Sequence, residues 1–186
     1  MARLTGLVLA VALTLIAVSA SARANLSESS PPLPSGYQEG PATLRCIIQS
    51  SSKQGVPANV LLGLFSAEGM KNGQILTNEN GSKDLGHFGI NTIHWDQEKG
   101  LFRNHPEITQ HDVAVRGCYN AEIAAWLLKL HLERNTGQDF WTRAANYHSG
   151  TPEFNAKYKA KLIPYSVYWG QWLNSRYNAV SISYLD

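Results

Sequence analysis

The sequence predicts one mainly α-helical domain with room for a single short, irregular β-hairpin. Apolar residues recur at every third or fourth position in several windows, which is the period of a helix that buries one face. The alternation of apolar and polar residues that marks half-buried strands is largely missing. With 186 residues, 44% of them hydrophobic and 16% charged, the chain is long and apolar enough to form its own core.

The N-terminus is expected to be a signal peptide. Arg3 supplies a positive charge, residues 6–18 form a nearly unbroken apolar run, and residues 22–24 match the A-x-A cleavage pattern. The run is shorter than the ~20 apolar residues that span a bilayer. We therefore expect residues 1–24 to be removed on export. Cleavage two or four residues earlier, or retention as an uncleaved anchor, are the alternatives.

The predicted mature chain is electrically balanced. The sequence has 16 basic and 14 acidic side chains, and loss of Arg3 and Arg23 with the signal peptide leaves 14 of each. A neutral protein has no general attraction for nucleic acid or for an anionic membrane. We therefore expect no nucleic-acid partner and, because no second long apolar run exists, no stable membrane span after signal removal.

The chain has two cysteines, Cys46 and Cys118. In an oxidising compartment such a pair predicts a disulfide, and the chain-entropy model assigns a loop of about 70 residues roughly 4 kcal/mol of stability. Two free buried thiols are the alternative. A disulfide would also exclude a cysteine nucleophile.

Residues 25–42, rich in Ser, Pro and Gly, are expected to form a flexible leader, so the folded domain spans residues 43–186. A first helix is expected over residues 43–53, with Gly55 as its stop signal. The second helix, over residues 57–69, begins with a proline, whose missing N–H is not needed in the first turn, and ends at a glycine.

The rest of the chain alternates loops and helices. Asn and Gly crowd residues 71–91, which favours turns and at most a short hairpin. Asp112 is expected to cap a short helix, and residues 122–134 carry the strongest helical periodicity. Residues 140–147 and 152–163 are expected to form two further helices, followed by an aromatic C-terminal tail.

Glu68 is the leading candidate for chemistry. It lies four residues after Leu64 and seven after Leu61, so it shares their apolar helix face at the C-terminal end of that helix. Burial and the negative partial charge of a helix C-terminus both raise the pKa of a carboxyl group. A carboxyl group protonated near neutral pH can act as a general acid. A glutamate turned to solvent is the alternative that position alone leaves open.

A polar loop follows this glutamate. Asn78, Asn80, Ser82 and Asp84 precede the aromatic and glycine-rich residues 86–91. Amides and hydroxyls beside aromatic faces are typical of sugar-binding sites. Ordinary turn chemistry uses the same residue types, so composition leaves both interpretations open.

At this point the chain resembles a known family, the soluble lytic transglycosylases, which are relatives of goose-type lysozyme. The resemblance covers residues 43–165 and is closest to small exported members associated with conjugation, type IV secretion or type IV pili. Its motifs stand in the family's order: Ala67-Glu68-Gly69, then the loop from Asn80-Gly81-Ser82 through Ile90-Asn91, then Ala145-Asn146-Tyr147-His148-Ser149-Gly150-Thr151-Pro152. Each motif alone is weak, whereas their order and spacing together are specific.

The resemblance implies a lysozyme-like, two-lobed domain around an active-site cleft. Glu68 would be the catalytic acid and then the base, and Tyr147 would lie against the reacting sugar, within reach of a bond to the glutamate. Tyr158 would support the same wall, and Phe88 would take the place of a methionine that lines the sugar groove. The implied substrate-binding set is Ser82, Phe88, Asn91, Tyr147, His148 and Tyr158.

The chain departs from the family pattern at one position of the loop. The family usually has Met-Gln where this chain has Phe88-Gly89, and glycine cannot supply the glutamine's side-chain amide. Either Asn80 or Asn91 replaces that amide, or substrate binding is altered, or activity is low.

The implied reaction is cleavage of peptidoglycan between N-acetylmuramic acid and N-acetylglucosamine to leave 1,6-anhydro ends, in the periplasm and without a cofactor. A secretion, conjugation or pilus machine is the implied partner. A hydrolytic muramidase or chitinase, and a non-catalytic glycan-binding protein, are the alternatives. A two-carboxylate mechanism would need Glu79 or Asp84 as the second acid, and Asp84 is interpreted as a turn residue.

Other chemistries have weaker support. The six histidines form neither H-E-x-x-H nor a zinc-finger spacing, so no metal site is predicted. Ser149 lacks the G-x-S-x-G setting of a serine hydrolase. Trp169 and Trp172 are interpreted as packing residues or, if exposed, as a surface for sugar or a partner.

Overall fold

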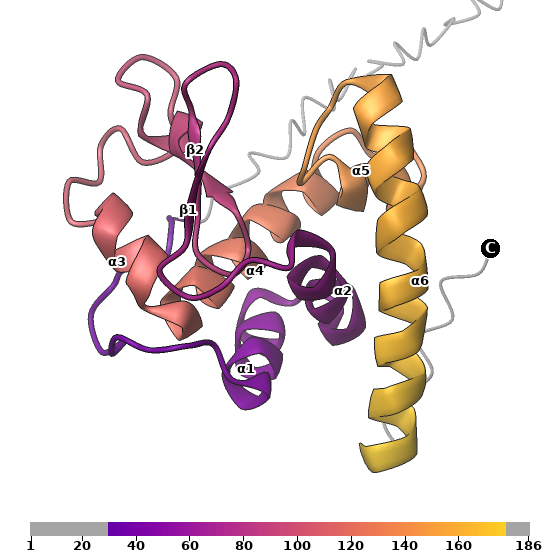
Figure 1. Cartoon of the computed structure of the whole chain (residues 1–186). Coiled ribbons are helices and arrows are strands. Elements are labelled where there is room, and N and C mark those ends of the chain that lie inside the picture. Colours follow the sequence, from indigo (N-terminus) through magenta and orange to yellow (C-terminus); the bar gives the residue numbers. More distant parts are fainter. Residues whose placement is uncertain (1–29, 178–186) are drawn as a thin grey trace, which may run out of the picture.

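The computed structural model describes residues 30–177 and confirms a mainly α-helical fold with a small antiparallel sheet (Figure 1). The predicted signal peptide and the last nine positions of the chain lie outside the described residues. The elements are α1 (Leu44–Gln54), α2 (Ala58–Glu68), β1 (Ile75–Thr77), β2 (Lys83–Leu85), β3 (Ile90–Asn91), the 3-10 turn η1 (Thr92–Trp95), α3 (Gln110–Val115), α4 (Gly117–Glu133), α5 (Phe140–Ala145) and α6 (Pro152–Tyr177).

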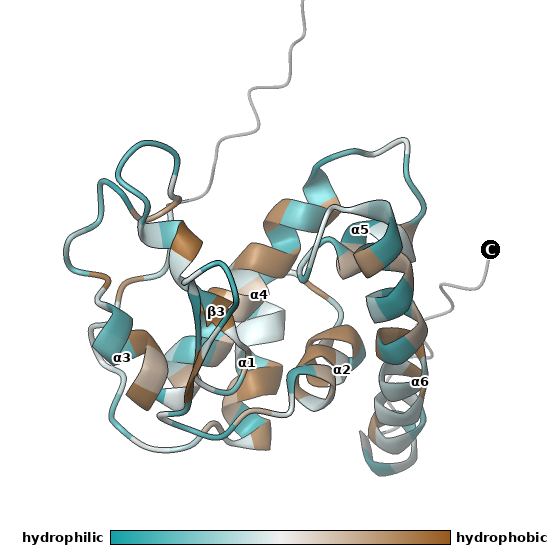
Figure 2. Ribbon diagram, turned by 45° about the horizontal axis from the view of Figure 1, so that its top comes forward, coloured by the Kyte–Doolittle hydropathy of each residue, from teal (hydrophilic) through white to brown (hydrophobic). Residues whose placement is uncertain are grey.

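Helix α4 forms the centre of the fold. Nearly every residue between Gly117 and Leu128 is buried, which is the pattern of a helix surrounded on all sides. Helices α1, α2, α3 and α5 pack around it, and α6 runs along the outer side of α2 (Figure 1). Apolar residues concentrate on α2 and α4, while the outer loops and the β1–β2 turn are hydrophilic (Figure 2).

The first two helices begin and end within about a residue of their predicted bounds, because their end signals are strong. The Thr43 side chain caps α1 by accepting a hydrogen bond from the Cys46 amide at 3.2 Å. Gly55 and Gly69 end the two helices in the left-handed conformation, at φ of 70° and 65°, which favours glycine.

The predicted hairpin is a three-stranded antiparallel sheet in the order β1-β2-β3. Ile75 pairs with Leu85, and Leu85 pairs with Ile90 on its other side. The short β2–β3 connection therefore returns the chain beside α2, close to the end at which Glu68 lies.

Three predictions of helix bounds are wrong. Thr109, not Asp112, caps α3, since its hydroxyl accepts from the Asp112 amide at 3.0 Å. Helix α4 begins at Gly117 rather than residue 122, because the small and polar residues of its first turn are also buried. Helix α6 continues through Pro164 to Tyr177; Pro164 is on the exposed side, where water can satisfy the carbonyl that loses its partner.

The described part of the predicted flexible leader, residues 30–42, packs against the domain. The Tyr119 hydroxyl donates to the Pro32 carbonyl at 2.9 Å, and the Gly117 amide donates to the Gly40 carbonyl at 2.7 Å. Tyr37 packs on Tyr119 with ring centroids 5.3 Å apart. These contacts correct the prediction of flexibility for this segment.

The predicted disulfide is confirmed. Cys46 of α1 and Cys118 of α4 are bonded, with Cα atoms 5.6 Å apart. The bond ties the N-terminal helix to the central helix. Within residues 30–177, none of the helices is long and apolar enough to cross a membrane.

Candidate active site

Glu68 occupies the last position of α2, where the chain turns away through Gly69. Its carboxyl group is largely buried, and burial raises its pKa to about 7. This pKa already includes the lowering effects of the Tyr158 hydrogen bond and of the Lys161 charge, and the smaller raising effect of the Asp84 charge. Glu68 can therefore both give and take a proton near neutral pH.

Tyr158 of α6 holds this carboxyl group. Its hydroxyl donates a hydrogen bond to Glu68 Oε1, and its side chain is only 6% exposed. This contact requires α6 to lie close against α2. Gly63 makes that possible, because a Cβ atom there would stand 2.3 Å from Ser166 Oγ. One turn further along, Trp169 Nε1 donates to Ser66 Oγ at 2.8 Å.

The backbone of Gly89 covers the other carboxyl oxygen. A Cβ atom at this position would stand 3.0 Å from Glu68 Oε2, and the residue has a φ of 58°. A side chain there would both strain the backbone and crowd the carboxylate. Gly89, at the position where the resemblance expects glutamine, therefore lets the loop approach Glu68.

The loop before Gly89 is anchored by Asn120, a residue of α4 that the sequence analysis missed. The buried Asn120 side chain accepts from the Phe88 amide at 2.8 Å and donates to the Leu85 and Val113 carbonyls, each at 2.9 Å. Gly86 leaves room for this amide, since a Cβ there would stand 2.8 Å from Asn120 Nδ2. The sequence predicted that this helix begins at residue 122, so Asn120 fell outside it and no local pattern marked it.

Tyr147 secures the same loop from the other side. Its hydroxyl donates to the Phe88 carbonyl at 2.8 Å, and not to Glu68. Burial raises the Tyr147 pKa well above its usual value, with added contributions from the charges of Glu68 and Asp84. The two tyrosines thus differ from the implied roles: Tyr158 bonds to the glutamate, and Tyr147 positions the loop beside it.

The expectation that the Phe88 side chain lines a sugar groove is wrong. Phe88 is 0% exposed and packs against Phe65 with ring centroids 5.5 Å apart. Burial of the apolar ring in the core is more favourable than its exposure to water, so only the backbone of Phe88 contributes to the site. The neighbouring His87 is also buried, and its Nδ1 lies 2.9 Å from the Met70 carbonyl.

His148 lies beside the site, where its ring stacks on Tyr158 with centroids 4.6 Å apart and an interplanar angle of 7°. Burial lowers its pKa, so the ring is neutral at pH 7. The stack leaves one side of His148 exposed next to the Tyr158–Glu68 pair.

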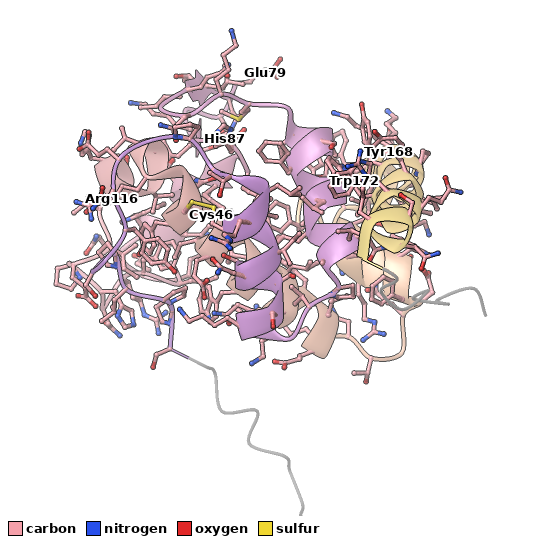
Figure 3. All side chains as sticks on the ribbon, turned by 90° about the horizontal axis from the view of Figure 1, so that it is seen from below. Cys46, Glu79, His87, Arg116, Tyr168 and Trp172 are labelled. Atoms are coloured by element: carbon pink, nitrogen blue, oxygen red, sulfur yellow. A yellow bond between two sulfur atoms is a disulfide. The ribbon has the colours of Figure 1, made fainter. Side chains whose placement is uncertain are left out.

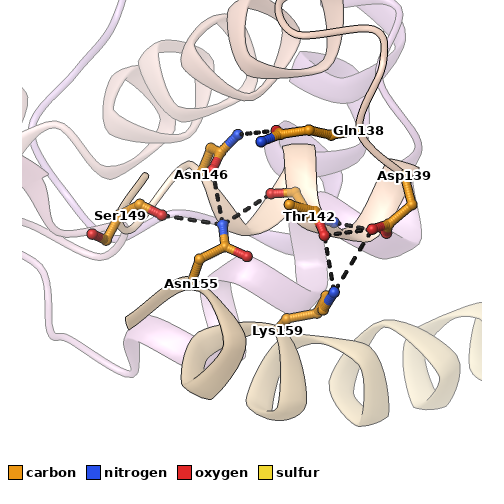
Figure 4. Close-up of polar contacts among 7 residues, drawn as sticks. All are labelled: Gln138, Asp139, Thr142, Asn146, Ser149, Asn155 and Lys159. Atoms are coloured by element: carbon orange, nitrogen blue, oxygen red, sulfur yellow. Dashed lines mark hydrogen bonds and ion pairs between the residues drawn. The ribbon is translucent and has the colours of Figure 1, made fainter. Parts of the chain in front are cut away.

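Asn155 of α6, also missed from the sequence, fixes the segment that carries Tyr147 and His148 (Figure 4). Its buried amide nitrogen lies within hydrogen-bonding distance of the Thr142 carbonyl, Asn146 Oδ1 and the Ser149 carbonyl, at 3.0, 2.8 and 3.1 Å. Lys159, one turn further, donates to Thr142 Oγ1 at 2.9 Å. The last motif is therefore attached to α6, the helix that also supplies Tyr158.

Ser82, Asp84 and Asn91 form a polar network across the sheet. The Asn91 amide nitrogen lies 2.7 Å from Asp84 Oδ1 and 3.2 Å from Ser82 Oγ. Asn78 donates to the second oxygen of Asp84 at 3.1 Å. The Asn91 amide therefore bonds inside the sheet and does not replace the glutamine amide that the resemblance implies. Asp84 bonds to residues of the same sheet and its loops.

The site residues therefore divide into two groups. Glu68, Tyr158, Gly89 and His148 lie together, with Tyr147 behind the loop, whereas Ser82 and Asn91 belong to the sheet network around Asp84. In residues 30–177, no group of three or more His, Cys, Asp or Glu side chains could hold a metal ion. The chain matches no model of a known protein family, and no curated protein is significantly similar to it.

Proposed function

We propose that this protein is a lytic transglycosylase that cleaves the peptidoglycan glycan strand. The observation that carries the proposal is the Glu68 carboxyl group, whose pKa is raised to about 7 and which is held by the Tyr158 hydroxyl. A glycosidic oxygen is a poor leaving group unless it is protonated as the bond breaks, and such a carboxyl group supplies that proton.

In the proposed reaction the same group acts twice. Protonated Glu68 donates its proton to the oxygen between N-acetylmuramic acid and N-acetylglucosamine, and the bond from that oxygen to C1 of the muramic acid breaks. The substrate's acetamido oxygen stabilises the positive charge at C1. The muramic acid C6 hydroxyl then attacks C1 and gives its proton to Glu68, which closes the 1,6-anhydro ring without consuming water and regenerates the acid.

The surroundings of the other carboxylates favour this one-carboxylate route. A second catalytic carboxylate in a glycosidase lies about 5 to 9.5 Å from the first and faces the substrate. Asp84 instead accepts hydrogen bonds from Asn78 and Asn91 on its two oxygens. Glu79 is exposed at the outer tip of the β1–β2 turn (Figure 3).

The resemblance to the small exported transglycosylases supports the substrate and suggests the setting. The signal-peptide pattern and the Cys46–Cys118 disulfide fit a protein of the periplasm. We propose that the enzyme opens the wall locally for a secretion, conjugation or pilus system.

A comparison of Glu68→Gln with Glu79→Gln tests the proposal. Glutamine keeps the size and the hydrogen bond from Tyr158 but cannot transfer the proton. We expect Glu68→Gln to lose at least ~1000-fold in turnover of purified peptidoglycan, whereas Glu79→Gln, a matched change of an exposed carboxylate, keeps wild-type activity.

Mass spectrometry of the digest identifies the reaction. We expect 1,6-anhydromuramic acid ends; reducing ends in their place would replace the transglycosylase with a hydrolase. If the wild type and Glu68→Gln both fail to cleave but bind the strand equally, the protein is a glycan-binding relative and not an enzyme.

A further inference from the structure

One flank of α6 carries aromatic and basic side chains in a single line. Lys161, Tyr165, Tyr168, Trp172 and Arg176 follow one another at intervals of three or four residues, so they share one side of the helix. Tyr165 is 40% and Tyr168 57% exposed. Trp172 is partly buried. Two exposed rings in one line are unusual on a helix whose other side is already packed on α2.

This line begins at the candidate active site. Lys161 lies one turn after Tyr158, and its charge reaches both the Glu68 carboxyl group and His148. The line therefore starts one helical turn from the residue that holds Glu68.

The side chains of this line combine two kinds of recognition. Tyrosine and tryptophan rings offer flat apolar faces with a polar edge, which suit the C–H faces and hydroxyls of sugar rings. Lys161 and Arg176 add positive charge at its two ends, and the Arg176 guanidinium carbon lies 5.4 Å from the centre of the Trp172 ring. A sugar polymer that also carries carboxylates matches both.

We propose that this flank of α6, which we call the α6 line (Lys161, Tyr165, Tyr168, Trp172 and Arg176), is an additional binding site for the glycan strand. The inference rests on the proposed function and adds to it a preference for long strands. At a rise of about 1.5 Å per residue the line is about 22 Å long, so it holds several sugar units beyond the bond that is cleaved. Carboxylates of the stem peptides, or lactyl carboxylates where no peptide is attached, would face Lys161 and Arg176.

Binding is tested in the Glu68→Gln background, where the strand stays intact. Tyr168→Ser should weaken binding to purified peptidoglycan sacculi by about 3- to 10-fold, the range for loss of one aromatic contact, and Tyr165→Ser/Tyr168→Ser should weaken it further. Val167→Ala is the matched control, because Val167 is 46% exposed on a different side of the same helix. Binding should also weaken as salt is raised, and less so in Arg176→Gln.

Chain length separates this inference from the proposed function. In the otherwise wild-type enzyme, Tyr168→Ser should lower kcat/KM on sacculi by a similar factor but leave cleavage of a tetrasaccharide fragment unchanged. If Tyr168→Ser has the melting temperature of the wild type and also its kcat/KM on both substrates, the α6 line is not a binding site. The proposal that Glu68 is the catalyst would be unaffected. A tetrasaccharide that Glu68→Gln still cleaves would instead overturn the proposed function.

The line could alternatively bind another protein. Sedimentation of the wild type and Tyr168→Ser decides this, since we expect monomers of equal size for both. A wild-type dimer that dissociates in Tyr168→Ser, without a change in sacculus binding, would overturn the proposal and assign the line to an interface between copies of the chain.

Discussion

The buried Glu68 carboxyl group lowers the stability of the folded protein when it is ionised, and the proposed chemistry depends on the same burial. Its pKa is about 7 in the folded protein and 4.5 as an ordinary glutamate, so the folded state disfavours the charged form. The group's contribution to stability is fully present below pH 4.5 and is lost as the pH rises through 7. Above that window the lost stabilisation amounts to about 3 kcal/mol.

Glu68→Gln should therefore stabilise the protein while it abolishes activity. We expect a free energy of unfolding higher by about 2 to 3 kcal/mol at pH 8 and unchanged at pH 4, measured by urea denaturation. Glu79→Gln, at an exposed position, should change neither value. A Glu68→Gln variant that is less stable than the wild type at pH 8 would contradict the raised pKa.

In the proposed mechanism, the Tyr158 hydroxyl sets the pH range over which Glu68 transfers its proton. Its hydrogen bond favours the carboxylate and lowers the Glu68 pKa, so Tyr158→Phe should raise that pKa. The alkaline limb of kcat/KM should move to higher pH, and the maximum rate should fall about 10-fold, because a charge-assisted hydrogen bond is lost. Tyr37→Phe is the control, since Tyr37 bonds to a different buried glutamate, Glu122. A limb that moves to lower pH would refute this role.

The proposed site requires glycine at position 89, and the glutamine that the resemblance expects there should not raise activity. Gly89→Ala and Gly89→Gln both place a Cβ 3.0 Å from Glu68 Oε2 at a φ of 58°. We expect a loss of about 1 to 2 kcal/mol in stability from the left-handed backbone, and at least a 10-fold loss of activity from displacement of the carboxylate. Gly73→Ala has a similar φ of 73° with nothing within 4 Å, so it should lose stability only. Higher activity in Gly89→Gln would mean that the missing amide, and not space, limits the enzyme.

At the scale of elements, the segments that the sequence predicted best are those with local signals. Helix α2 combines an apolar 3.6-residue period, a proline at its start and a glycine at its end, all within a dozen residues. The sequence predicted that helix α6 ends before Pro164, because a proline ordinarily ends a helix. No local pattern reveals that α2 packs along the turns that follow.

Tyr147 and Tyr158 differ from their implied roles for the same reason: their contacts depend on packing between distant elements, which no local pattern reveals. Residues 147 and 158 are both placed near Glu68 by the resemblance, but which hydroxyl reaches the carboxyl group depends on how closely α6 approaches α2. That distance is decided at Gly63, where Ser166 packs against the bare backbone. Glu68 itself could be predicted, because its helix face and helix end are local properties.

The β2–β3 connection, which carries Gly89, is held in place by hydrogen bonds to the Asn120 side chain. Asn120→Ala would leave the Phe88 amide and the Leu85 and Val113 carbonyls without their partner. We expect the free energy of unfolding to fall by about 3 kcal/mol and the Phe88 amide to exchange its hydrogen faster, as measured by urea denaturation and by hydrogen exchange. Asn104→Ala, in an exposed loop, is the control. Unchanged exchange at Phe88 would show that Tyr147 alone holds the loop.

At the scale of the whole molecule, the contacts that attach the N-terminal part of the chain differ from those that surround Glu68. The Glu68 site is built where α2, the β2–β3 connection and α6 meet, whereas α1 and residues 30–42 attach to α3 and α4 through the disulfide and the contacts of Tyr119. A change in the second group should therefore lower stability without altering the geometry around the carboxyl group.

Removal of the disulfide tests this separation. The bond closes a loop with a sequence separation of 72, for which the chain-entropy model gives about 4 kcal/mol. We expect Cys46→Ser/Cys118→Ser to lose about that much in guanidinium denaturation, and the wild type to lose the same amount when a reductant is added, while the double variant is insensitive to it. At a temperature well below the melting point, kcat on peptidoglycan should stay within about twofold of the wild type, because no contact of Glu68 has changed. A large fall in kcat of the still-folded variant would instead mean that α1 and α4 position the catalytic end of α2, and that the two regions are coupled through the core.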